Sequence, residues 1–176
     1  MDTIKQRRTV GSIMQISLAE GYFSYARVLQ EPFFAFYDIY TKEEITALDQ
    51  ITSSPILFIT SVSTTAITSN RWLKIGKKTL KESLQELPPQ FTQNPLNPDE
   101  YTIVYMDDSN KVATKEDCVG LERASLWQVD KMEERLQDHF TGKKNYWEEQ
   151  IQKPETYRKN SKVYPERVKE LLKGLE

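Results

Sequence analysis

The stretch over residues 22–39 limits the possible folds more than any other part of this chain. It is dense in aromatic and β-branched residues, which favour strands, and its one interruption is Glu31-Pro32, which cannot continue a strand pairing. Before it, residues 14–18 alternate between apolar and polar types, and Gly21 can adopt the positive φ that closes a hairpin. These features predict a three-stranded antiparallel meander at the N-terminal end of an α+β protein.

The last strand of this meander carries large apolar side chains on both of its faces. Phe34 and Phe36 point to one side of a sheet, because successive residues of a strand alternate, whereas Phe33, Ala35 and Tyr37 point to the other. One buried face does not need so many aromatic residues. We therefore expect both faces of the sheet to be covered, at least in part.

The chain between residues 41 and 98 predicts a mixture of short elements. Thr41 with Glu44 three positions later is typical of a capping box, so a helix is expected over residues 42–48. The β-branched run over residues 56–62 is typical of a central strand. The pattern then predicts a helical turn, a strand and an extended proline-rich surface loop, over residues 64–70, 72–75 and 88–98.

A later hairpin is predicted from two strand-like runs, residues 101–106 and 111–114, which flank Asp107-Asp108-Ser109-Asn110. Two adjacent carboxylates could indicate a metal site. A turn stabilised by its own side chains is the better interpretation, because no further acidic ligand follows at the spacing of a metal-binding loop.

Residues 120–127, Gly-Leu-Glu-Arg-Ala-Ser-Leu-Trp, precede an amphipathic helix. Asp130 and Glu133 form a variant of the capping box, so this helix is expected to begin near Asp130 and to end at Gly142. Its apolar stripe consists of Val129, Met132, Leu136 and Phe140. The positions that we expect to face solvent are Asp130, Glu134, Gln137 and Asp138. Further helices are predicted over residues 145–152 and 165–175.

Charge is distributed unevenly along the chain, although the net charge is only -2. Residues 97–138 contain eleven acidic and five basic residues, whereas residues 143–173 contain nine basic and five acidic residues. The basic region could in principle meet nucleic acid, but its interspersed acidic residues favour a solvated face. No direct contact with nucleic acid is expected.

Residue types that carry catalysis are scarce in this sequence. Cys118 is the single cysteine and His139 the single histidine, so neither a disulfide within the chain nor a zinc site of Cys and His ligands can be assembled. Cys118 is expected to pack as a small apolar side chain, and His139 to lie at a helix end. We therefore predict no catalytic residue, no bound metal and no cofactor.

The apolar runs are too short to suggest a membrane span, which needs roughly 18 residues, and residues 1–8 lack the apolar stretch of a secretion signal. A cytoplasmic protein without a membrane partner is expected.

Two segments give the chain a resemblance to a known family. Residues 21–29, Gly-Tyr-Phe-Ser-Tyr-Ala-Arg-Val-Leu, with Ala-Phe-Tyr-Asp at 35–38, form the first, and the Gly-Leu-Glu-Arg-Ala run ending in Trp127 forms the second. In this order they resemble the immunity protein 26 family of bacterial polymorphic toxin systems, and the resemblance runs over residues 11–142. Ala26 stands where the family pattern has Gly, and Ser125-Leu126 where it has Ala-Val. The residues that match the motif and are expected to be structural are Tyr25, Arg27, Tyr37, Asp38, Trp72, Gly120, Glu122, Arg123, Trp127 and Arg135.

The resemblance implies a domain over residues 1–142, on which residues 143–176 pack as a helical extension. It also implies a function: neutralisation of a cognate toxin domain through direct binding. Such binding requires an interface of about 1,600 Å². The resemblance does not specify the toxin, and a nuclease is our hypothesis for it. The acidic residues that we expect to bind the toxin are Asp107, Asp108, Asp130, Glu134 and Asp138. Two alternatives remain open, a small β-rich module that binds peptide or nucleic acid and an enzyme of unrecognised type.

Overall fold

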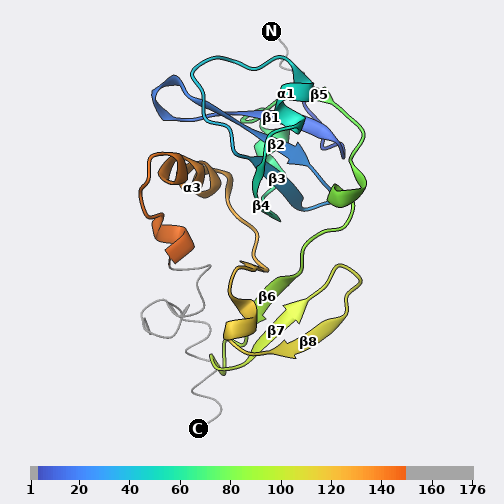
Figure 1. Ribbon diagram of the computed structural model, residues 1–176, viewed down its shortest axis with the longest axis vertical. Helices are drawn as coiled ribbons and strands as arrows, with labels where there is room; N and C mark the ends of the chain where they lie inside the picture. The colour runs from blue at the N-terminus through green and yellow to red at the C-terminus, as the bar shows by residue number, and fades with distance from the viewer. Residues whose placement is uncertain (1–3, 150–176) are drawn as a thin grey trace. The chain divides into compact units, whose positions relative to one another are not determined.

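The computed structural model describes residues 4–149 and has an α+β fold made mostly of strands (Figure 1). The described chain forms two compact units. The first contains the residues up to Leu87 together with Ser125–Lys143, and the second contains Pro88–Ala124 and the residues from Lys144 onward. The helix predicted over residues 165–175 lies outside the described residues.

The first unit is built on a five-stranded antiparallel sheet in the order β4-β3-β2-β1-β5. Its strands are β1 (Ser12–Ser17), β2 (Phe23–Val28), β3 (Phe33–Tyr37), β4 (Ile56–Ser61) and β5 (Leu73–Lys77). The predicted meander is confirmed as β1, β2 and β3, and Gly21 has a φ of 76° at the first turn. A short 3-10 helix, η1 (Ala19–Gly21), forms this turn.

The prediction of a central strand over residues 56–62 was wrong in its position, because β4 forms an edge of the sheet. Its apolar character has another cause. Phe58 of β4 packs between the Phe36 ring, at 5.1 Å between centroids, and the guanidinium of Arg135. Helix α3 (Val129–Phe140), which carries Arg135, thus contacts a side chain of this edge strand.

Both faces of the sheet are buried, as the alternation along β3 predicts. On one face, Tyr37 joins Ile13, Tyr25 and Ile51 in a cluster that includes α1 (Leu48–Thr52). Gly76 of β5 is needed there, because a Cβ at this position would lie 2.5 Å from Cδ1 of Leu48. On the other face, the rings of Phe34 and Phe36 lie edge-on to Trp72, at 5.4 and 5.8 Å between centroids.

The helix predicted over residues 42–48 was wrong, because α1 begins only at Leu48 and Ala47 before it is extended. Tertiary contacts hold this segment against the sheet. Thr41 pairs with Phe23 as an isolated bridge, and the backbone N–H of Ile45 donates to the Tyr25 hydroxyl at 2.7 Å. The Thr41 hydroxyl accepts from Glu43 at 3.1 Å, which forms a local turn in place of a helix cap.

The predicted helical turn over residues 64–70 is confirmed as α2 (Thr65–Thr68). Helix α3 begins at Val129, near the predicted start, but its predicted capping box is wrong. Gln128 flanks the helix without a side-chain capping bond, and the Glu133 carboxylate instead accepts hydrogen bonds from Arg71 and from the indole N–H of Trp72.

The second unit contains a four-stranded sheet in the order β8-β7-β6-β9. The strands are β6 (Gln90–Gln93), β7 (Tyr101–Val104), β8 (Asn110–Ala113) and β9 (Glu122–Arg123), and all pairs are antiparallel except β6 with β9. The structure also contains the 3-10 helices η2 (Glu82–Leu84) in the first unit and η3 (Glu116–Cys118) in the second.

The prediction of a surface loop over residues 88–98 was wrong in part, because β6 lies inside it. The four residues of β6 fit between Pro89 and Pro95, and Phe91 among them is fully buried against Tyr101, Ile103 and Cys118. This small cluster is the core of the second unit. The hairpin predicted around residues 107–110 is confirmed as β7 and β8.

Beyond Lys143 the structure describes only the start of the next predicted helix. Residues 146–149 are helical, and the Asn145 side chain accepts from the backbone N–H of Glu148 at 2.9 Å. The rest of the helix expected over residues 145–152 lies outside the described residues.

Candidate functional site

The turn between β7 and β8 carries two of the acidic residues that the sequence singles out. The Asp107 carboxylate accepts hydrogen bonds from the backbone N–H of Ser109, at 3.0 Å, and from the Ser109 hydroxyl. These bonds lower the pKa of Asp107, so it stays charged at neutral pH. Asp108 follows with a φ of 63°, a conformation that Asp and Asn tolerate better than most residues. The turn interpretation of this acidic pair is therefore confirmed.

Exposed apolar side chains lie on both sides of this turn, and the sequence pattern did not predict their exposure. Tyr105 and Met106 are 38% and 39% exposed immediately before it, and Val112 of β8 is 86% exposed after it. β8 is also an edge of its sheet (Figure 1). We call Tyr105, Met106, Asp107, Asp108 and Val112 the acidic hairpin. The residue that could have indicated this exposed hairpin is Val112, which is β-branched and stands between a lysine and an alanine in the predicted strand.

Acidic charge is concentrated in one segment of the second unit. This segment, 88–124, contains seven acidic and three basic residues, whereas the two segments of the first unit contain thirteen of each. Asp117 is one of these acidic residues, and hydrogen bonds to the backbone N–H and the side chain of Thr114 lower its pKa. The Thr114 hydroxyl also accepts from the backbone N–H of Asp117 at 3.2 Å. The acidic region that the sequence shows over residues 97–138 is therefore divided between the units, and most of its net charge lies in the second.

The acidic residues expected on the outer face of α3 are accompanied by a base. Asp130 and Glu134 are exposed, and each lies within 4 Å of the Lys131 ammonium, at 3.6 and 3.8 Å. Asp138 is half-buried. The expectation that Gln137 faces away from the core was wrong, because its side chain bonds to the Tyr40 hydroxyl and to the backbone N–H of Ala19. The solvent face of α3 therefore carries mixed charge.

Trp127 and Arg135, two residues of the family motif, meet in the interior of the first unit. Trp127 is 5% exposed, and its backbone bonds to Ser61 and Ser63 at the end of β4. Arg135 is equally buried, with its guanidinium 3.8 Å from the Phe58 ring centroid and 5.0 Å from that of Trp127. Such stacking stabilises a cation that burial would otherwise destabilise.

The other motif residues after Gly120 order the second unit. Gly120 has a φ of 85° and precedes β9, in which Glu122 is half-buried and Arg123 is buried. Arg123 donates to the Gln93 side chain at 2.8 Å and lies 4.9 Å from the centroid of Phe91. The strand geometry places Glu122 and Arg123 on opposite faces, as expected.

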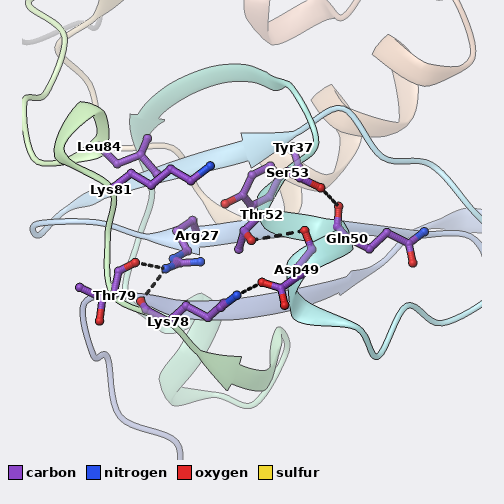
Figure 2. A pocket seen from close by; sticks show the side chains of 10 residues that line it. All are labelled: Arg27, Tyr37, Asp49, Gln50, Thr52, Ser53, Lys78, Thr79, Lys81 and Leu84. Carbon is purple, nitrogen blue, oxygen red and sulfur yellow. Dashed lines mark hydrogen bonds and ion pairs between the residues drawn. The ribbon is translucent and has the colours of Figure 1, made fainter.

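Two of the N-terminal motif residues line a pocket of about 460 Å³ in the first unit (Figure 2). Arg27 of β2 is 2% exposed and donates to the carbonyl oxygens of Lys78 and Thr79. Tyr37 of β3 also lines the pocket. Burial raises the pKa of Tyr37, and the nearby Arg27, to which its hydroxyl is hydrogen-bonded, opposes that effect. Asp38, next along the chain, is exposed and outside this pocket.

The carbonyl of Lys78 is held in place by a tight backbone contact. Gly11 has a φ of 88°, and a Cβ at this position would lie 2.5 Å from the Lys78 oxygen. The backbone N–H of Lys78 in turn donates to the Gly11 carbonyl at 3.1 Å. The glycine thus allows the chain after β5 to approach β1 and brings two acceptors to Arg27.

Cys118 and His139 lie in different units, so the structure supplies no geometry that pairs them. Cys118 is buried in the core of the second unit, where burial raises the pKa of its thiol. His139 is exposed near the end of α3. Across residues 4–149, no group of three or more His, Cys, Asp or Glu side chains gathers at metal-binding distance. Within the same residues, no helix has the length and apolar character that would let it cross a membrane.

Most aromatic residues of the meander are not available as a binding platform. Tyr25, Phe33, Phe34, Phe36 and Tyr37 are at most 5% exposed, and only Tyr22 and Phe23 are half-buried. A nucleic-acid reader that stacks bases on strands β2 and β3 would need these rings at the surface. The structure therefore weakens that alternative.

Comparison with known proteins decides the family. The family model described as Immunity protein 26 matches residues 9–102, which is more than half of the chain. The chain belongs to the immunity protein 26 family. The match includes all five strands of the first unit and β6, whereas the Gly-Leu-Glu-Arg run after Gly120 lies beyond the matched residues. No curated protein and no solved structure shows a significant match.

Proposed function

We propose that this immunity protein protects a bacterial cell by binding one cognate toxin directly in the cytoplasm. The observation that carries the proposal is the family match over residues 9–102. Neutralisation of this kind requires complementary surfaces and no chemical step, so we assign no catalytic residue, metal or cofactor. The binding energy would come from an interface of about 1,600 Å² in which a few buried side chains dominate.

The acidic hairpin is the surface that we assign to the toxin. Aromatic residues and Met are enriched at protein interfaces, and Tyr105 and Met106 lie exposed beside the two turn carboxylates. The edge strand β8 adds backbone groups that a partner strand can pair with. The acidic face of α3, with Asp130, Glu134 and Asp138, is a second candidate whose charge is partly offset by Lys131.

The charge of segment 88–124 in the second unit favours a toxin with a basic surface. Segment 88–124 has four more acidic than basic residues, which would speed the encounter with a cationic partner and help to exclude anionic ones. Nucleases have such surfaces because they bind phosphate backbones. We therefore propose a nuclease domain as the partner, with the immunity protein covering its basic surface.

The test uses the toxin domain encoded beside this gene and two matched valine variants. Val112→Lys places a positive charge in the acidic hairpin at a position that is 86% exposed, so the fold should tolerate it. Val119→Lys makes the same change at a position that is 75% exposed in the same unit but outside the hairpin. We expect Val112→Lys to weaken toxin binding at least tenfold and to abolish growth protection, while Val119→Lys remains close to the parent.

Further measurements test the hairpin interface and the immunity function separately. Asp108→Asn removes one charge without straining the positive φ at this turn, and should reduce the salt dependence of binding. Equal affinities for both valine variants would remove the hairpin from the interface. Failure of the parent protein to bind or protect against that toxin would contradict the proposed function itself.

A further inference from the structure

We infer that the pocket beside Arg27 binds a small molecule through a phosphate group. The pocket lies wholly within the first unit, is lined by residues of the sheet, of α1 and of the chain after β5, and has a volume of about 460 Å³. Small-molecule sites commonly range from about 300 to 1,000 Å³. This inference goes beyond the immunity role and does not depend on the toxin.

The pocket has an excess of positive charge. Arg27, Lys78 and Lys81 line it, and Asp49 is the one carboxylate among its ten lining residues. Asp49 is ion-paired with the Lys78 ammonium, so it does not neutralise the other two cations. Figure 2 shows the three basic side chains arranged around the same hollow. A guanidinium stays charged at any physiological pH, and a dianionic group would balance this excess.

Arg27 carries one donor group that the described residues do not satisfy. Its side chain is 2% exposed, its Nη2 donates to two carbonyl oxygens, and its guanidinium is also hydrogen-bonded to the Tyr37 hydroxyl. Its Nε has no hydrogen-bond partner in the described part of the chain. A buried charged donor without a partner is destabilising, and an anion close to the guanidinium would reduce that cost. The other terminal nitrogen points away from the two carbonyls, toward Thr52 and Asp49, in Figure 2.

Hydroxyl groups complete the lining. Thr79 and Tyr37 contribute two, and Thr52 and Ser53 at the end of α1 contribute two more. The Thr52 and Ser53 hydroxyls donate to the carbonyls of Asp49 and Gln50, at 3.5 and 3.2 Å, so Thr79 and Tyr37 are the hydroxyls that we assign to the ligand. Burial raises the pKa of Tyr37, which keeps its hydroxyl protonated.

Charge, rather than the geometry of Arg27, favours phosphate over carboxylate. A guanidinium binds either group best through two parallel N–H bonds, and both of its paired edges include Nη2. In this protein Nη2 is occupied by the carbonyls of Lys78 and Thr79. Recognition therefore depends on the excess of two positive charges, which a phosphate dianion matches better than a carboxylate with a single charge.

The test measures binding of inorganic phosphate to the full chain by calorimetry, with chloride used to hold ionic strength constant and acetate as the carboxylate comparison. Lys81→Gln removes one cation from the exposed side of the pocket, and Lys74→Gln removes an exposed lysine of β5 that does not line it. We expect saturable phosphate binding at millimolar concentration, weakened on the order of tenfold in Lys81→Gln and unchanged in Lys74→Gln. Acetate should bind more weakly than phosphate.

Three results would overturn this inference. They are absence of saturable phosphate binding by the parent protein, equal weakening in both lysine variants, and acetate binding as tight as phosphate binding. Arg27→Gln is unsuitable as the main variant because Arg27 also ties β2 to the chain after β5. Lys78→Gln, which leaves only the exposed Asp49 without its ion pair, serves as the second variant and should weaken phosphate binding as Lys81→Gln does.

Discussion

Trp127 is the residue at which several parts of the first unit meet. Its ring lies against Arg135, and its backbone bonds continue the pairing at the end of β4. The indole N–H has no partner among the described residues, so its contribution comes from packing and from the cation that it stacks on. The side chain is thus an anchor of the core, as the sequence suggested, although the family match ends before it.

Truncation of the Trp127 side chain should strongly destabilise the folded protein. Trp127→Ala leaves a cavity beside a buried arginine, and we expect a loss of about 3 to 5 kcal/mol in the free energy of unfolding. Urea denaturation measures this loss, with Leu126→Ala as the control, because Leu126 is 53% exposed and should change stability by about 0.5 kcal/mol or less. An unchanged urea midpoint for Trp127→Ala would place Trp127 outside the core and make it a candidate contact for a partner.

Among the elements, α3 and the β7–β8 hairpin are the two that carry the acidic residues proposed to bind the toxin. They differ in composition. Each carries a lysine beside its carboxylates, Lys131 on α3 and the exposed Lys111 on β8. The hairpin alone places its turn carboxylates, Asp107 and Asp108, beside exposed apolar side chains. A surface that combines apolar area with acidic charge is the better interface.

Charge reversal on α3 tests this ranking. Changing Asp130, Glu134 and Asp138 to Lys should reduce toxin affinity less than Val112→Lys does, by about threefold or less, because only long-range attraction is lost. Unfolding should become slightly easier, since Asp130 favours the N-terminal end of the helix and Asp138 is half-buried. Affinity at two salt concentrations and a thermal melt measure both effects. A larger loss than that caused by Val112→Lys would move the interface to α3.

At the scale of the whole molecule, each unit buries tyrosine hydroxyls that must stay protonated. Burial raises the pKa of Tyr25 and Tyr37 in the first unit and of Tyr101 in the second. A group whose pKa is higher in the folded state stabilises the fold below its unfolded pKa, which is about 10 for tyrosine. That stabilisation is lost as the pH rises through the folded-state pKa values.

The protein should therefore become less stable above a pH of about 10. We expect the melting temperature to change little from pH 8 to about 10 and then to fall, and Tyr37→Phe should fall less steeply because its ring cannot ionise. Circular dichroism melts across this range measure the effect, and Tyr146→Phe, which changes a 59% exposed tyrosine, is the control. If the curves of the parent and Tyr37→Phe are parallel, folding does not raise the pKa of Tyr37.

Local patterns in the sequence determined the meander, both buried faces of β3, the β7–β8 hairpin and the extent of α3. These features depend on alternation, helical periodicity and turn chemistry, all of which act between near neighbours in the chain. The family resemblance, carried by Tyr25, Arg27 and their neighbours, belongs to this group as well. So does the burial of Cys118, which follows from its apolar character.

Tertiary contacts decided the rest. The segment at 42–48 has a capping pattern but is not helical, because Ile45 bonds to Tyr25 from a distant strand. Proline spacing could not show that Phe91 is buried, since its partners at Tyr101 and Cys118 lie in other elements. The Arg27 pocket could not be predicted from the sequence for the same reason. Its lining residues come from β2, α1 and the chain after β5, and only folding brings these groups together.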